Sequence, residues 1–174
     1  MSRAPLETLI LAMLLAAGII LQAVEAIYLP PMLIPGVKFG LANSITLIVM
    51  VLFSARDALT HVALRATTVS LVTGTFLSTT FIYSLSGGLA SAIVMLWFYR
   101  IFFGPFSFAG VSLVGALTHN LTQLALATMI LGHLGVVTLA PWLIFMAVIA
   151  GVPNGVLVNI VAPRLTAISR QLQR

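Results

Sequence analysis

The chain has 174 residues, of which 61% are hydrophobic and only 6% are charged, with a formal net charge of +5. Soluble domains are about 45–50% apolar and about a quarter charged, so this chain has too few charges to coat a water-soluble fold. The composition excludes an ordinary soluble enzyme and a disordered chain. The basic residues are spread singly, which also excludes a nucleic-acid-binding domain. We therefore expect an integral membrane protein in contact with the lipid bilayer.

Apolar runs along the chain predict six transmembrane helices within a single domain, residues 1–174. Backbone inside lipid must be hydrogen-bonded internally, and the runs lack the alternation of barrel strands, so the expected fold class is all-α. The Pro-rich segment 28–40 should form the first outer loop, and the Ser-Leu-Ser-Gly-Gly segment 84–88 should form a turn. The expected spans are approximately 6–24, 40–55, 58–80, 85–99, 108–131 and 139–162.

The basic residues predict the orientation of these spans. With six spans and the N-terminus inside, the cytoplasmic segments carry six arginines, whereas the outer loops carry only Lys38. Because cytoplasmic loops are enriched in Lys and Arg, this bias predicts cytoplasmic N- and C-termini in a multi-pass protein of the inner (cytoplasmic) membrane. A signal peptide cleaved near residues 24–26 is the alternative reading of the first run. The six arginines are Arg3, Arg56, Arg100, Arg164, Arg170 and Arg174.

Acidic and sulfur-bearing residues are scarce, which limits the chemistry that the chain can support. Cys is absent, and Glu7, Glu25 and Asp57 are the only carboxylates. These residues do not readily supply a carboxylate pair for acid–base catalysis or for Mg²⁺, and the chain has no P-loop for ATP. We therefore expect a protein that is not an enzyme and that holds neither a metal ion nor a cofactor.

Arg65 is the most informative polar residue, because an ionised side chain within a membrane span is costly. It lies in the third predicted span, eight residues after Asp57, and His61 shares its helix face. Three interpretations remain open at this point. Arg65 is an anion ligand or a buried ion-pair partner, it snorkels towards the headgroups, or it joins Asp57 and His61 in a local network.

Polar residues in the fifth and sixth predicted spans suggest the wall of a binding site. His119 and Gln123 lie one turn apart on one helix face, with Asn120 beside them. The alternative is that they only form interhelical hydrogen bonds, worth about 0.6–2 kcal/mol each in membranes. In the sixth span Asn154 lies between two glycines, which favour close helix packing, and its side chain is expected to face the same site.

Two further groups lie near the first loop and in the first span. Lys38 lies in a Gly-flanked loop just before Asn43, at a helix start whose partial positive charge favours an anionic or polar ligand. The alternative for Lys38 is interfacial anchoring. Ala12 and Ala16, four residues apart in the first span, let another helix approach closely.

Three sequence strings support a resemblance to a known family. The strings Pro35–Asn43 (PGVKFGLAN), Ser84–Leu89 (SLSGGL) and Gly115–Gln123 (GALTHNLTQ) resemble the membrane family called Gx transporters, also labelled heptaprenyl diphosphate synthase component I. That family is similar to the substrate-binding S components of energy-coupling-factor (ECF) vitamin transporters. The resemblance implies a six-helix bundle that binds a solute near its outer side. It also implies docking onto a transmembrane coupling subunit through Ala12 and Ala16, with a pair of ATPases supplying energy.

Two functional hypotheses follow. The first is a membrane-embedded, substrate-binding subunit for uptake of a small polar or anionic vitamin-like solute, such as a flavin or an isoprenoid-related precursor. The second is a non-catalytic membrane accessory or scaffold of heptaprenyl diphosphate (isoprenoid or quinone) synthesis, since prenyl diphosphate synthases resemble one another in two Asp-rich motifs and this chain has one Asp. The predicted solute-binding residues are Lys38, Asn43, Arg65, His119, Asn120, Gln123 and Asn154.

Overall fold

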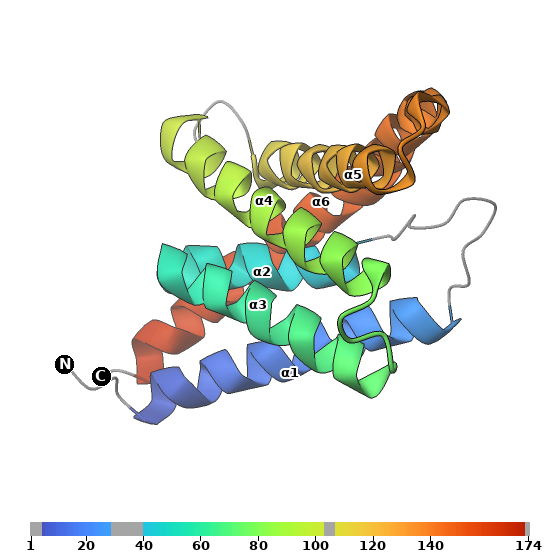
Figure 1. Ribbon diagram of the computed structural model, residues 1–174. Helices are drawn as coiled ribbons and strands as arrows, with labels where there is room; N and C mark the ends of the chain where they lie inside the picture. The colour runs from blue at the N-terminus through green and yellow to red at the C-terminus, as the bar shows by residue number, and fades with distance from the viewer. Residues whose placement is uncertain (1–4, 29–39, 103–106, 173–174) are drawn as a thin grey trace.

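The computed structural model describes residues 5–28, 40–102 and 107–172, and these residues form helices joined by short connections (Figure 1). The expected all-α class is confirmed for this part of the chain. The helices in chain order are α1 (Pro5–Tyr28), α2 (Leu41–Leu52), α3 (Ala55–Val72), α4 (Thr79–Phe102), α5 (Phe108–Leu131), the 3-10 helix η1 (Leu134–Leu139) and α6 (Ala140–Leu172).

Four helical segments of the described chain are long and apolar enough to cross a membrane: α1, α4, α5 and the segment 134–167. Large apolar side chains such as Leu9, Met13 and Ile20 of α1 are exposed, which is favourable in lipid but not in water. The protein is therefore a multi-pass membrane protein. α2 has 12 residues and is about 18 Å long, less than the roughly 30 Å of a bilayer core, and α3 is much less apolar than the long helices.

The short helix α2 is at the centre of the bundle. It packs against α1, α3, α4, α5 and α6, and seven of its twelve residues are buried. The main apolar core forms around it, where Leu47 and Val49 of α2 meet Met95 of α4, Val111 of α5 and Val158 of α6. Ala42 and Ser44 of its first turn are buried, so this part of α2 contacts protein, whereas Leu41 is exposed.

Close backbone contact holds α5 against α6. A Cβ atom placed on Gly155 would lie 2.3 Å from the Cα of Ala109, and one on Gly151 would lie 2.8 Å from the Cα of Leu113. Only glycine fits at these two positions, so the expectation of close packing in the sixth span is confirmed. α6 continues through Pro153, also as expected.

The turn expected at residues 84–88 is wrong. The chain turns instead at residues 73–78, where Gly74 and Leu77 have positive φ angles of 69° and 61°. The third helix therefore ends at Val72 rather than near residue 80, and the fourth begins at Thr79 rather than near residue 85. Of the other expected spans, 108–131 coincides with α5, and the last helix extends ten residues further than expected.

Gly87 and Gly88 explain why the sequence pattern wrongly predicted a turn at residues 84–88. They lie inside α4, where a Cβ on Gly87 would be 3.1 Å from Cε1 of His119 and a Cβ on Gly88 would be 2.8 Å from Cγ1 of Val62. Glycine in a helix interior costs about 1 kcal/mol relative to alanine. Here it makes room for side chains of α3 and α5 on two sides of α4, so its role is packing rather than turning.

Candidate functional site

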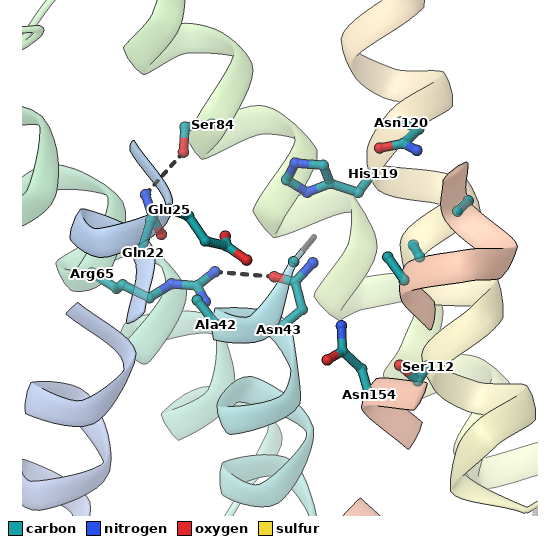
Figure 2. A pocket seen from close by; sticks show the side chains of 14 residues that line it. Gln22, Glu25, Ala42, Asn43, Arg65, Ser84, Ser112, His119, Asn120 and Asn154 are labelled. Carbon is teal, nitrogen blue, oxygen red and sulfur yellow. Dashed lines mark hydrogen bonds between the residues drawn. The ribbon is translucent and has the colours of Figure 1, made fainter. Parts of the chain in front are cut away.

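A small polar cavity lies inside the bundle, and all six α-helices contribute to its wall (Figure 2). The space open to the centres of water molecules is about 30 Å³. Most of the described residues around it carry polar side chains, although the surrounding helices are largely apolar. The polar lining residues are Gln22, Glu25, Asn43, Arg65, Ser84, Ser112, His119, Asn120 and Asn154.

Arg65 and Asn43 meet at one side of the cavity. Arg65 lies in the middle of α3 and is only 3% exposed, and its Nη2 donates a hydrogen bond of 3.2 Å to Oδ1 of Asn43 in the first turn of α2. The guanidinium points towards the cavity rather than towards the surface (Figure 2). The snorkelling interpretation of Arg65 is therefore wrong in this structure.

The proposed local network of Asp57, His61 and Arg65 is not what the structure shows. Asp57 caps the start of α3, because its Oδ2 accepts from the backbone N–H of Ser54 at 3.1 Å and Ser54 Oγ accepts from the backbone N–H of Asp57 at 3.2 Å. His61 turns towards α2 and α1, where its ring nitrogens lie 3.4 Å from Thr46 Oγ1 and from the Leu14 carbonyl oxygen. The side chains of Asp57, His61 and Arg65 thus have different hydrogen-bond partners.

Two residues near the end of α1, Gln22 and Glu25, line the cavity but were not predicted as site residues. Glu25 is 3% exposed, and its Oε1 accepts a hydrogen bond of 2.9 Å from the backbone N–H of Leu41, at the start of α2. Gln22 Nε2 donates to Ser84 Oγ of α4 at 3.1 Å. Two polar residues three apart in an apolar helix share a face, so their spacing was a signal that the sequence already contained.

The predicted polar wall on α5 has two separate roles. His119 and Asn120 line the cavity, and Asn120 Nδ2 also donates a 2.8 Å hydrogen bond to the Leu143 carbonyl of α6. Gln123 is buried but does not line the cavity, because it packs against α4 and donates to the Tyr83 carbonyl at 3.4 Å. Polar residues of α5 therefore both line the cavity and form interhelical hydrogen bonds. The two interpretations offered for them each describe only part of this arrangement.

The remaining predicted residues lie at different places. Asn154 of α6 is 6% exposed and lines the cavity opposite α2, together with Ser112 of α5, which was not predicted (Figure 2). Lys38 lies outside the described residues. Ala12 and Ala16 are exposed on the outer face of α1 and take no part in the cavity.

The described lining is suited to recognition by hydrogen bonds. It combines amide and hydroxyl groups with one imidazole, one guanidinium and one carboxylate, and so offers both donors and acceptors around a small space. Glu25 and Arg65 interact electrostatically across this space. Such a set can hold a small polar molecule in one orientation.

Comparison with known proteins identifies the family. The family model described as heptaprenyl diphosphate synthase component I matches residues 14–161, a range that contains every cavity-lining residue described above. A search of curated proteins and a search of solved structures each found no similar chain. Since the match extends over most of the sequence, the chain belongs to the heptaprenyl diphosphate synthase component I family.

Proposed function

We propose that this chain is the solute-binding subunit of an uptake system in the inner membrane, similar to the S components of ECF transporters. The observation that carries the proposal is the polar cavity, to which all six α-helices of a largely apolar bundle contribute. Polar side chains within a membrane protein are costly and usually mark a substrate site or pathway. The chain itself has no proposed catalytic role, because Asp57 caps α3 and Glu25 lies in the cavity wall.

The size of the cavity limits the solute. A volume of about 30 Å³ open to water centres has room for only about two or three water molecules. A small polar or anionic solute is therefore favoured, and a flavin-sized ring system would require the helices to separate. The predicted solute-binding residues that line this space are Asn43, Arg65, His119, Asn120 and Asn154.

The position of the cavity supports binding from the outer side. It lies beside the end of α1 and the first turn of α2. With a cytoplasmic start of α1, this end of the bundle faces outward. The start of α1 and the end of α6 lie on one side of the bundle in Figure 1, which supports an even number of crossings, as the proposed topology requires.

Solute retention tests the proposal. The protein is purified in mild detergent, its small molecules are extracted, and they are identified by mass spectrometry. Wild-type protein should retain a solute that Asn154→Leu loses, because Asn154 lines the cavity. Asn159→Leu is the matched control on the same helix, since Asn159 is exposed, does not line the cavity, and accepts a hydrogen bond of 3.3 Å from the Phe108 N–H. Empty wild-type protein, or equal retention in both variants, would contradict the proposal.

The proposed partner is a transmembrane coupling subunit that works with a pair of ATPases. Its docking face on this chain is the small-residue surface of α1 at Ala12 and Ala16, which are both exposed. Ala12→Trp should abolish co-purification with the coupling subunit, whereas Ala26→Trp, an equally exposed control near the other end of α1, should not. Unchanged co-purification of the Ala12→Trp variant would contradict the proposal that Ala12 and Ala16 form the docking face.

The description of the family favours one second candidate. It names a component of heptaprenyl diphosphate synthase, and a non-catalytic membrane accessory that recruits a separate synthase would fit that description. This candidate predicts that the polar cavity serves packing only. Wild-type protein that carries no solute yet captures a prenyl diphosphate synthase would favour it over the uptake subunit.

A further inference from the structure

The guanidinium of Arg65 has hydrogen-bonding capacity that the described chain leaves unused. The side chain is 97% buried, and one of its donors, Nη2, bonds to Asn43. Its Nε and Nη1 atoms are buried and have no hydrogen-bond partner. A guanidinium carries five N–H donors and remains charged, and a buried donor without an acceptor is destabilising. A cation in this state beside a polar cavity favours an acceptor that comes from outside the chain.

The surrounding helices hold this cation in position. A Cβ on Gly18 of α1 would lie 3.2 Å from Cδ of Arg65, and one on Gly88 of α4 would lie 4.0 Å from its Nη2. Gly18 and Gly88 therefore leave room for the Arg65 side chain between α1 and α4. Such preorganisation lowers the entropic cost of binding an anion, because the long side chain has already lost its freedom.

The charges around the cavity limit the charge of the ligand. Among the described lining residues Arg65 is the basic side chain that stays charged at all relevant pH values, and Glu25 supplies one carboxylate. A phosphate monoester carries a charge of about −1.5 to −2 at pH 7, and a diphosphate carries more. Glu25 already offsets the charge of Arg65, so in a low-dielectric site each further negative charge of a ligand is repelled. A carboxylate brings one such charge and can still accept from the guanidinium, whereas a phosphate or diphosphate brings more.

The neutral part of the lining suits the remainder of such a ligand. The amides of Gln22, Asn120 and Asn154 and the hydroxyls of Ser84 and Ser112 present donors and acceptors without net charge. These groups can bind hydroxyl, carbonyl or amide atoms of a solute. They do not compensate a second ionised group.

We propose that the solute is a small organic monoanion whose carboxylate binds Arg65, with Asn43 as the positioning residue for the guanidinium. This inference rests on the proposed function and narrows its solute class. It separates carboxylates from phosphate and diphosphate compounds, including isoprenoid diphosphates. The neutral polar groups of the solute then contact the amide and hydroxyl side chains.

Thermal melting in nanodiscs of phosphatidylcholine tests the inference. The probes are acetate and lactate, the corresponding neutral amides, inorganic phosphate and pyrophosphate. At least one carboxylate should raise the melting temperature of the wild type, its amide should not, and Arg65→Gln should abolish the response. Asn159→Leu should retain it. A response to phosphate or pyrophosphate alone, an equal response to the amide, or no response to any carboxylate would overturn the inference.

A second variant keeps the test valid if Arg65→Gln fails to fold. Asn43→Asp keeps an acceptor at the position that bonds to Nη2 and adds a second negative charge to that of Glu25. The protein should therefore fold and lose its response to added carboxylates, because the added charge repels them. A persistent response in this variant would overturn the inference. So would a phospholipid that native mass spectrometry finds on the wild type but not on Arg65→Gln.

The two proposals fail in different ways. A neutral or phosphorylated solute in the retention assay, without a melting response to any carboxylate, would contradict the inference of a monoanionic solute. It would not contradict the proposed uptake function. No retained solute together with no carboxylate response would overturn both.

Discussion

Gly155→Ala tests whether the contact between α6 and α5 determines the geometry of the cavity. The added Cβ would lie 2.3 Å from Cα of Ala109 and 2.5 Å from the carbonyl oxygen of Phe108. Carbon atoms pack at about 3.5–4.0 Å, so the helices would have to separate by roughly 1.2–1.7 Å. Both contacted atoms belong to the backbone and cannot rotate away. Overpacking of this kind costs about 1–3 kcal/mol.

The same displacement should affect solute binding. Asn154 precedes Gly155 and lines the cavity, so it would move away from the wall on α5. We expect a lower melting temperature by tryptophan fluorescence in detergent and a lower amount of retained solute. The control is Val156→Leu, which adds one methylene to a side chain that is 45% exposed, and it should change neither measurement. An unchanged melting temperature in Gly155→Ala would refute the packing argument.

Two further substitutions test individual contacts. Ser54→Ala should lower the free energy of unfolding by about 1 kcal/mol, because Ser54 Oγ caps the backbone N–H of Asp57. In a melting experiment the exposed control Thr60→Ala should be at least as stable as the wild type, because alanine is the better helix former. Equal values for both variants would show that the cap contributes nothing. Asn120→Leu removes the hydrogen bond to the Leu143 carbonyl and should cost about 0.6–1.7 kcal/mol. Wild-type stability of this variant would assign Asn120 to ligand binding alone.

Much of the fold could be predicted from the sequence, because membrane helices are recognisable from apolar runs and their interruptions. The bounds of α5 were predicted correctly. A break between the second and third helices was also expected, but it lies at residues 53–54, three residues before the expected gap at 56–57. The boundary between α3 and α4 was predicted wrongly, because glycines such as Gly87 and Gly88 occur both in turns and at close helix contacts. Only the neighbouring side chains of α3 and α5 distinguish these roles, and neighbours across helices are not visible in a linear sequence.

The site was predicted in part for a similar reason. Polar residues in the middle of apolar runs stand out, and Asn43, Arg65, His119 and Asn154 indeed line one cavity. Glu25 was not among the predicted site residues, because it directly follows the expected first span, 6–24, where a polar residue is ordinary. Its contact with the start of α2 depends on how the chain returns after α1, which spacing within one helix does not reveal.

The length of α6 has a consequence for how this protein can be observed. Its 33 residues extend over about 50 Å at 1.5 Å per residue, whereas the hydrocarbon core of a bilayer is about 30 Å thick. Ordinary tilts of about 20° shorten the projection only slightly, so one end of α6 must emerge into the aqueous phase. A fluorophore or spin label on that emerging end would report any tilt of the helix that carries Asn154, without altering the binding site itself.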